Sequence, residues 1–244
     1  MEIFTGSKSK VICLVGAGGK KTTMYALSKY LKGNIALTST THMYFYDERY
    51  VDRLVSVRQG KYPSFLEEGV RVRAYFGPEI GKSRVAGLPE STLKFIWENG
   101  SEDYMLIKAD GARARLIKAP NEREPLIPSF ADTVVPVLSL KVIGKNLTPA
   151  VAHRVEHLSA IMGMMPGDRI EPKNLVKLMT SRSGFLKNTE GKRVLPLINM
   201  ADSVEEVATS VSIAKESLAQ TSDYDAVAIG SMKTGTVKEV VYRV

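Results

Sequence analysis

Glycine, lysine and threonine crowd into one short stretch near the start of the chain, and together they could bind phosphate. The stretch reads Gly16-Ala17-Gly18-Gly19-Lys20-Lys21-Thr22-Thr23. Glycine lets a backbone approach an anion closely, free amides at the start of a helix attract it, and lysine adds a positive charge. The residue types therefore predict a site for the phosphates of a nucleotide.

A strand and a helix must flank this stretch if its amides are to face a ligand. Residues 11–15 form a short apolar run rich in β-branched side chains, which is typical of a buried strand. On the other side, Met24, Leu27, Tyr30 and Leu31 recur at helical spacing. The pattern predicts a strand, a glycine turn and a helix.

The lysine that would contact phosphate can be placed in two registers. The common motif has four residues between its glycines, followed by lysine and a hydroxyl residue, whereas Gly16 and Gly19 are separated by two residues. In the first register Lys20 contacts phosphate and Thr22 supplies the hydroxyl. In the second, Lys21 and Thr22 are the working pair. We favour the first because it keeps a glycine directly before the lysine. The alternative to both is a turn that only packs strand against helix.

An acidic residue follows a second apolar run. Residues 104–107 predict a buried strand that leads to Asp110. In phosphate-loop enzymes a carboxylate at this point holds magnesium beside the nucleotide. We therefore expect Thr22 and Asp110 to bind Mg²⁺, with Lys20 and Asp110 as the catalytic pair. The alternative is that Asp110 belongs to an Asp-Gly turn without such a role.

Other polar groups also follow predicted strands. The run Thr38-Ser39-Thr40-Thr41-His42 either reaches the metal or γ-phosphate or only caps its own loop. Arg113, with Arg115 and Lys118, either clamps a second anionic group or lies in a solvated loop.

Asn199 and Asp202 come after the apolar run 195–198. Guanine-binding proteins use Asn-Lys-x-Asp at such a point, with the aspartate on the base, whereas a helix N-cap at Asp202 or Ser203 explains the same residues. The expected nucleotide contacts are thus residues 16–23, Thr40, Thr41, His42, Arg113, Asn199 and Asp202.

Composition limits the class of protein. The 244 residues are 44% hydrophobic and 25% charged, as in ordinary globular proteins. The single cysteine, Cys13, lies in a predicted strand and excludes a disulfide framework, and no apolar run is long enough to span a bilayer. We expect a cytoplasmic protein without membrane contact. The net charge of +8 favours an anionic ligand, and because the basic residues are dispersed we expect small phosphorylated molecules rather than nucleic acid.

Alternating strand and helix patterns predict one α/β domain over residues 1–244, with a mostly parallel sheet covered by helices on both faces. Residues 70–76 alternate charged and apolar side chains, as in a half-exposed edge strand, and 237–244 is expected to be a final edge strand. Further strands are expected at 34–38, 133–138, 193–198 and 226–230, and helices at 89–98, 153–162, 171–180 and 204–219.

Several stretches, taken in order, resemble one known family. They are residues 15–20, 38–42, 109–113, 118–120, 124–128, 153–156 and 199–202. The set resembles the YqeC family, described as accessory proteins of selenium-dependent molybdenum hydroxylases. The resemblance implies a phosphate-loop NTPase-like fold and a role in maturing a molybdenum enzyme. Lys108 stands where the family usually has Glu, and Lys21 where it usually has Thr or Ser.

The resulting hypothesis is a protein that binds ATP or GTP with Mg²⁺, hydrolyses it slowly and serves a molybdenum hydroxylase or its cofactor. Two alternatives stay open. One is a nucleotide or molybdenum-cofactor carrier without hydrolysis, which Lys21 and Lys108 favour. The other is a small-molecule kinase or nucleotidyltransferase whose acceptor binds Arg113 and Arg115.

Overall fold

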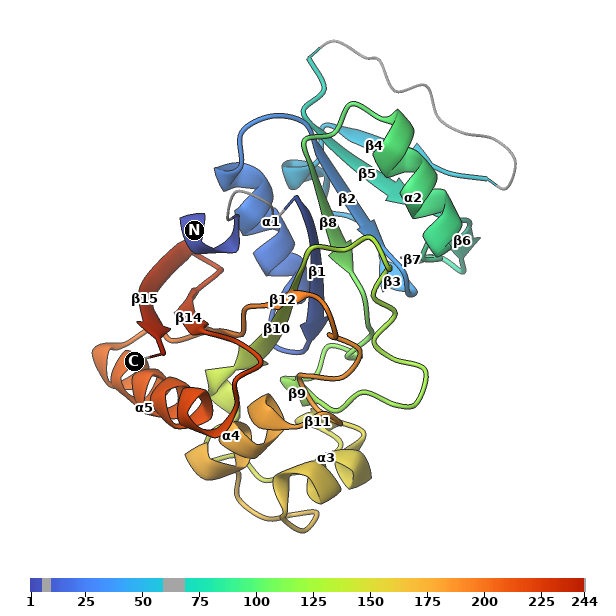
Figure 1. Cartoon of the computed structure of the whole chain (residues 1–244). Coiled ribbons are helices and arrows are strands. Elements are labelled where there is room, and N and C mark those ends of the chain that lie inside the picture. Colours follow the sequence, from blue (N-terminus) through green and yellow to red (C-terminus); the bar gives the residue numbers. More distant parts are fainter. Residues whose placement is uncertain (6–9, 59–68, 244) are drawn as a thin grey trace.

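A computed structural model describes residues 1–5, 10–58 and 69–243. Within these residues a ten-stranded sheet runs in the order β15-β14-β13-β10-β1-β8-β2-β5-β4, with β12 paired to β10 (Figure 1). Its strands are β1 (Val11–Gly16), β2 (Ile35–Ser39), β4 (Arg53–Ser56), β5 (Val72–Phe76), β8 (Tyr104–Lys108), β10 (Thr133–Ser139), β12 (Arg193–Val194), β13 (Leu197–Asn199), β14 (Ala226–Ser231) and β15 (Thr236–Tyr242). Neighbouring strands are parallel, except that β15 runs antiparallel to β14.

The remaining elements are short strands and helices. Two small sheets pair β9 (Ile117–Lys118) with β11 (Ala152–His153), and β7 (Arg84–Val85) with both β3 (Met43–Tyr44) and β6 (Glu79–Ile80). The α-helices are α1 (Lys20–Tyr30), α2 (Glu90–Asn99), α3 (Val155–Met162), α4 (Pro172–Thr180) and α5 (Val204–Gln220). Single turns of 3₁₀ helix are η1 (Glu2–Phe4), η2 (Glu48–Tyr50) and η3 (Leu140–Val142).

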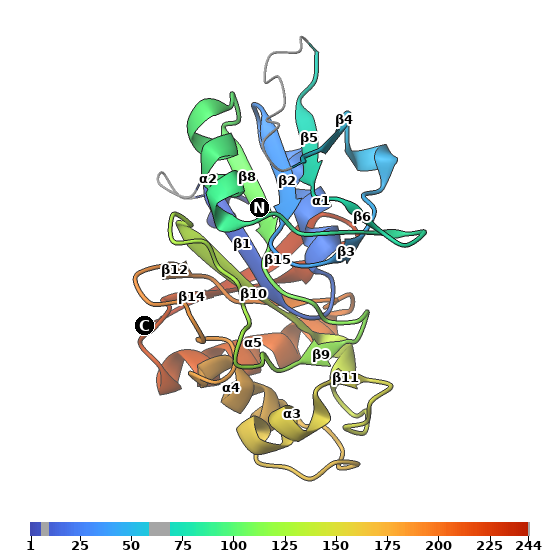
Figure 2. The same cartoon turned by 90° about the vertical axis from the view of Figure 1, so that its right-hand side faces the viewer.

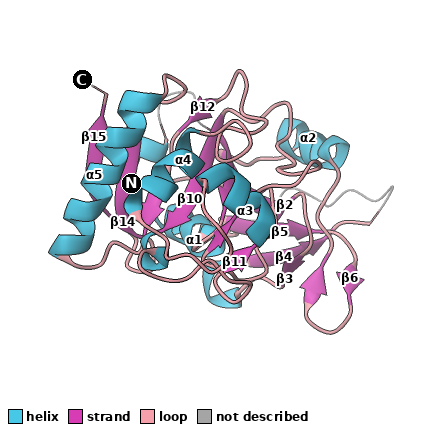
Figure 3. Cartoon of the chain, turned by 90° about the horizontal axis from the view of Figure 1, so that it is seen from below, coloured by secondary structure: helices cyan, strands magenta, loops and turns pink. Residues whose placement is uncertain are grey.

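Helices cover both faces of the sheet. Successive side chains of a strand point to opposite faces, so an apolar strand needs a helix on each side to bury them. In β1, Leu14 belongs to the apolar cluster that contains Met24 of α1, whereas Cys13 belongs to the cluster that contains Leu93 of α2. Figure 2 shows α1 and α2 on opposite sides of the central strands. The view from below shows α3, α4 and α5 grouped together (Figure 3), and these helices share a third apolar cluster with Ile229 of β14. The expected α/β fold with a mostly parallel, doubly covered sheet is confirmed.

The order of the strands brings several loops to one place. Strand β1 lies between β8 and β10, and β13 lies next to β10. Because these strands are parallel, the segments that follow their carboxyl ends meet at the same edge of the sheet. The glycine turn after β1 therefore meets Asp110 after β8, Ser139 at the end of β10 and Asn199 at the end of β13.

The structure corrects the expectation for residues 70–76. Strand β5 is buried throughout and lies between β2 and β4, so it is not an edge strand. The charge that suggested exposure is compensated internally: Arg73 lies 3.9 Å from the buried carboxylate of Glu102. Residue 244, the last of the expected strand 237–244, lies outside the described residues, and β15 is the edge strand there.

A second correction concerns residues 193–198, which form two short strands, β12 and β13, instead of one. Pro196 stands between them and has no amide hydrogen to donate to a sheet, which accounts for the break. Of the helices in the described ranges, none combines the length and the apolar composition that crossing a bilayer requires.

Candidate functional site

The glycine turn after β1 is shaped by close packing. Gly16, Gly18 and Gly19 have φ angles of 84°, 87° and 118°, in the region that side chains disfavour. A Cβ atom on Gly18 would lie 2.4 Å from Cβ of Ser139, and one on Gly19 would lie 2.4 Å from Nδ2 of Asn199. The glycines are therefore required by both backbone conformation and contact with the neighbouring strand ends.

The turn leaves backbone amides available to a ligand. The amide of Gly16 donates to Oδ2 of Asp110 at 2.8 Å, and that of Ala17 donates to the Val137 carbonyl at 3.0 Å. The amides of residues 18–22 find no acceptor among the described residues, and the helical pattern begins with Thr23, whose amide donates to the Gly19 carbonyl. Free amides at the first turn of a helix attract an anion.

The structure brings Lys20, and not Lys21, back to this turn. Lys20 is the first residue of α1 and is only 6% exposed. Its Nζ lies 2.9 Å from Oδ1 of Asp110 and contacts the Gly16 carbonyl oxygen. Lys21 instead donates to the carbonyl oxygens of Tyr44 and Phe45. Burial lowers the pKa of Lys20, although the Asp110 carboxylate opposes this shift.

The Asp110 carboxylate forms ion pairs with two lysines. Its Oδ1 faces Lys20 and its Oδ2 lies 2.9 Å from Nζ of Lys118. Burial alone would raise the pKa of Asp110, but the two ammonium groups outweigh it and hold the pKa below its usual value. Thr22 is exposed and lines a cavity on another side of α1. Thr22 and Asp110 are thus not brought together, and both Asp110 oxygens face ammonium groups, so the two residues do not form the expected magnesium site in this structure.

A further ion-paired layer lies behind Asp110. Nζ of Lys118 is 2.7 Å from Oε2 of Glu124, and the same oxygen is 2.8 Å from Nη1 of Arg154. Lys118 is on β9 and Arg154 follows β11, so the small sheet of these two strands positions both cations.

Positive charge exceeds negative charge around the glycine turn. Burial first, and then repulsion by Lys20, lowers the pKa of Lys108 to about 7. The group contains two carboxylates, Asp110 and Glu124, and four basic side chains, Lys20, Lys108, Lys118 and Arg154. An anionic ligand would balance this excess.

The hydroxyl run after β2 makes contacts of its own. Oγ1 of Thr40 donates to the Leu126 carbonyl at 2.9 Å, and Oγ1 of Thr41 accepts a hydrogen bond from Lys108 at 2.9 Å. His42 is exposed, and its carbonyl oxygen lies 3.5 Å from the same ammonium group. Arg113 is exposed in a turn with φ 48°. The expected contacts at these positions stay predictions.

Asn199 joins the glycine turn to the end of β14. Its Nδ2 donates to the Gly18 carbonyl at 2.8 Å, and its Oδ1 accepts from the Met232 amide at 2.9 Å. Asp202 is exposed and lies 3.3 Å from Nζ of Lys141. Ser203 is the N-cap of α5 and forms a capping box with Glu206. The helix N-cap that was the alternative explanation for this segment is therefore present.

Replacing Asn199 by alanine is expected to lower the free energy of unfolding by about 2–4 kcal/mol, because two buried backbone groups lose their partner. Urea unfolding measures the change. Asn99→Ala is the control. Nδ2 of Asn99 donates to the Phe95 carbonyl at an exposed helix end, so this substitution should lower the free energy of unfolding by no more than about 0.5 kcal/mol. Equal losses in the two variants would show that Asn199 does not brace the turn.

Comparison with known proteins now identifies the family. A family model described as YqeC protein matches residues 12–156. The chain belongs to the YqeC family. It is 26% identical over 241 residues to a protein of Escherichia coli (strain K12) named "Uncharacterized protein YqeC", with 96% of this chain and 91% of that protein covered. No solved structure matches the chain.

The region matched by the YqeC model contains the glycine turn and the ion-paired cluster around Asp110. The roles of Glu124 and Arg154 could not be predicted from single motifs, because both residues lie far from the turn in sequence. The ordered stretches of the YqeC resemblance contained both residues and were the signal that could have found them. Lys118 was expected on a second anion or in solvent, but it is buried against Asp110.

Proposed function

We propose that this YqeC protein binds a nucleoside triphosphate, ATP or GTP, at the glycine turn. One observation carries the proposal: the unpaired amides of residues 18–22 open beside a cluster with excess positive charge. Backbone amides supply directed hydrogen bonds to phosphate oxygens, and the basic side chains in excess over the carboxylates supply attraction.

Lys20 is the side chain that would change partners when phosphate binds. Its ammonium group already contacts the turn through the Gly16 carbonyl. Asp110 would keep Lys118 at 2.9 Å as its counter-ion, so moving Lys20 to phosphate would not leave the carboxylate unpaired. Lys108, the last residue of β8 and two residues before Asp110, would add part of a positive charge near neutral pH.

Hydrolysis in this site would be slow. Phosphoryl transfer depends on positioning and on charge stabilisation, and a water-orienting group speeds it. Asp110 would still be paired with Lys118 after Lys20 moves to phosphate, and Lys108 offers an ammonium group where the family usually has Glu. The same observation favours the second candidate, a carrier that binds nucleotide without hydrolysis. Release of phosphate from ATP or GTP separates the two.

A role in maturing a molybdenum hydroxylase rests on the family resemblance. We propose that the nucleotide-bound form contacts such an enzyme or its cofactor. Comparing the molybdenum content of a selenium-dependent hydroxylase made with and without this chain tests the role. Equal content would contradict it.

Calorimetric titration with ATP and with GTP tests nucleotide binding. Lys20→Met is expected to weaken binding at least about 30-fold, since a charge contact worth about 2 kcal/mol is lost. The matched variant Lys21→Met should stay within about threefold, because Lys21 contacts Tyr44 and Phe45 instead of the turn.

Lys20→Met also removes a buried ion pair, so its unfolding transition must be compared with that of the wild type at the titration temperature. If the variant is folded and binds as tightly as wild type, Lys20 does not contact phosphate. If Lys21→Met is the variant that loses binding, the second register of the turn is correct.

A further inference from the structure

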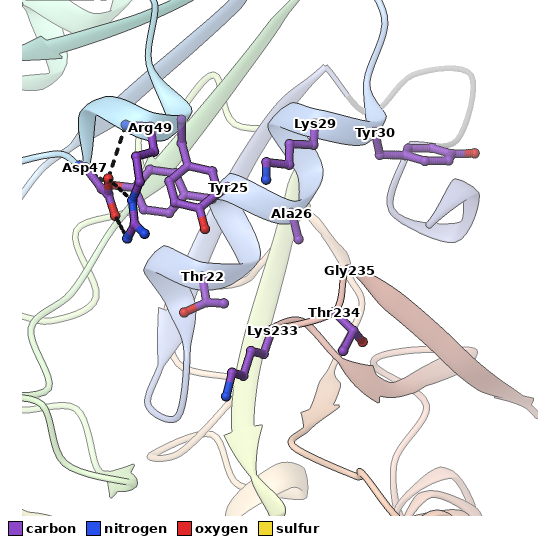
Figure 4. Close-up of a pocket in the computed structure, with 11 residues that line it drawn as sticks. Thr22, Tyr25, Ala26, Lys29, Tyr30, Asp47, Arg49, Lys233, Thr234 and Gly235 are labelled. Atoms are coloured by element: carbon purple, nitrogen blue, oxygen red, sulfur yellow. Dashed lines mark hydrogen bonds and ion pairs between the residues drawn. The ribbon is translucent and has the colours of Figure 1, made fainter.

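A polar cavity begins at the first turn of α1. It has a volume of about 510 Å³, within the usual range for small-molecule sites. Its walls come from α1, η2 and the turn between β14 and β15 (Figure 4). Thr22, the third residue of α1, lies at one end beside the free amides. The cavity and the glycine turn therefore share one helical turn.

Two lysines that line the cavity carry positive charge that no carboxylate of the described residues neutralises. Lys29 and Lys233 both line it, and neither forms an ion pair with any described residue. Arg49 also lines it but is held by Asp47, with Nη2 and Oδ2 2.6 Å apart. A ligand with negative charge or electron-rich heteroatoms suits such walls.

One wall is flat and aromatic. The rings of Tyr25 and Tyr50 stack with centroids 4.4 Å apart and planes 7° apart. The hydroxyl of Tyr25 accepts a hydrogen bond from the Asp47 amide, and Nζ of Lys29 lies 4.4 Å above the Tyr50 ring. These contacts hold the wall in place before a ligand arrives, which lowers the entropic cost of binding.

The polar groups of the cavity are arranged along α1. Figure 4 shows Thr22 and Lys233 toward the start of the helix and Lys29 further along it. From Thr22 to Lys29 the helix rises by about 10 Å, which is the length of a nucleoside. The Thr22 hydroxyl can donate to or accept from a sugar or a base edge, whereas the Thr234 hydroxyl already donates to the Ser231 carbonyl at 3.0 Å and can only accept.

We propose that this cavity binds the nucleoside part of the nucleotide whose phosphates occupy the glycine turn. Lys233 lies at the sugar-phosphate end, and the base lies toward Lys29 and the stacked tyrosines. The inference rests on the proposed function and adds the place and chemistry of the nucleoside subsite. It differs from a base site at Asp202, which does not line the cavity and is paired with Lys141.

Inorganic triphosphate separates the two parts of the ligand, because it has the phosphates without the nucleoside. Thr234→Trp places a bulky uncharged side chain in the cavity and changes no charge. It is expected to weaken ATP or GTP binding at least tenfold and to leave triphosphate binding within about twofold. Ser212→Trp, at an exposed position of α5, is the matched control and should change neither.

Lys29→Ala is a second variant that leaves the turn between β14 and β15 intact. It should lower the ratio of nucleotide to triphosphate affinity. Unfolding curves check that each variant is folded. If wild type binds nucleotide and triphosphate equally tightly, or if Thr234→Trp weakens both ligands equally, the nucleoside does not occupy this cavity.

Loss of nucleotide binding in Asp202→Ala, with Thr234→Trp unaffected, would place the base at Asp202 and overturn the inference. Failure of the proposed function has a different signature. In that case neither triphosphate nor nucleotide binds the wild-type chain, and the cavity inference falls with it.

Discussion

Replacing Lys118 by methionine is expected to lower the free energy of unfolding by about 3–5 kcal/mol, because the change removes the buried cation that Asp110 and Glu124 share and leaves each carboxylate with a single ion-pair partner. The Lys118 side chain is 1% exposed and pairs with both Asp110 and Glu124. Methionine keeps most of the side-chain volume, so the loss reports charge more than packing. Urea unfolding at neutral pH measures the difference.

Lys94→Met is the control for Lys118→Met. Lys94 lies 3.7 Å from Glu98 on α2, and both side chains are more than half exposed. Removing such a surface pair should cost no more than about 0.5 kcal/mol. A similarly small loss for Lys118→Met would contradict the buried cluster that the structure shows.

The loss of unfolding free energy caused by Lys118→Met should depend on pH. The pKa values of Asp110 and Glu124 lie below their usual range in the folded chain. A carboxylate with a lowered folded-state pKa contributes stability above its unfolded pKa, and that contribution disappears as the pH falls below about 4. The difference between wild type and Lys118→Met should therefore narrow in acid. The opposite trend would show that these carboxylates do not carry the effect.

Gly18→Ala is expected to lower the free energy of unfolding by about 2–5 kcal/mol and to abolish nucleotide binding. The left-handed backbone alone costs a side chain about 1–2 kcal/mol, and crowding adds about 1–3 kcal/mol. Gly18 has φ 87°, and an added Cβ would lie 2.7 Å from the Ser139 backbone nitrogen. Relief of this contact must move the turn and its amides.

Gly167→Ala is the control that separates the cost of the left-handed backbone from the cost of crowding. Gly167 has φ 91°, close to that of Gly18, and an added Cβ there would meet no atom within 4 Å. Gly167→Ala should lower the free energy of unfolding only by the backbone cost of about 1–2 kcal/mol, and it should leave nucleotide affinity unchanged. If Gly18→Ala is no more harmful than Gly167→Ala and still binds nucleotide, the turn is not held against β10 as described.

The strand, turn and helix that open the chain were predictable from sequence because their signals are local. The apolar run of β1, the glycines and the helical spacing of Met24 and Leu27 lie within one short segment. Parallel order could also be predicted, because alternating strands and helices leave few other topologies. For the same reason the meeting of Asp110 with the glycine turn could be expected.

What the sequence could not reveal depends on pairing between distant segments. Arg73 appeared exposed because its partner Glu102 lies in another segment of the chain. The partners of Asp110 come from α1 and β9, so its two ion pairs were not visible from the Asp-Gly pattern. The polar cavity joins Lys29 to Lys233, which are 204 positions apart in sequence.

The central claim is that the amides following β1 bind the phosphates of a nucleotide. Amide NMR spectra of the ¹⁵N-labelled chain, recorded during titration with ATP or GTP, test it most directly. We expect the largest shifts at the amides of Gly18, Gly19 and residues 20–22, which have no acceptor among the described residues. Nucleotide binding that leaves these amides unshifted, while others move, would contradict it.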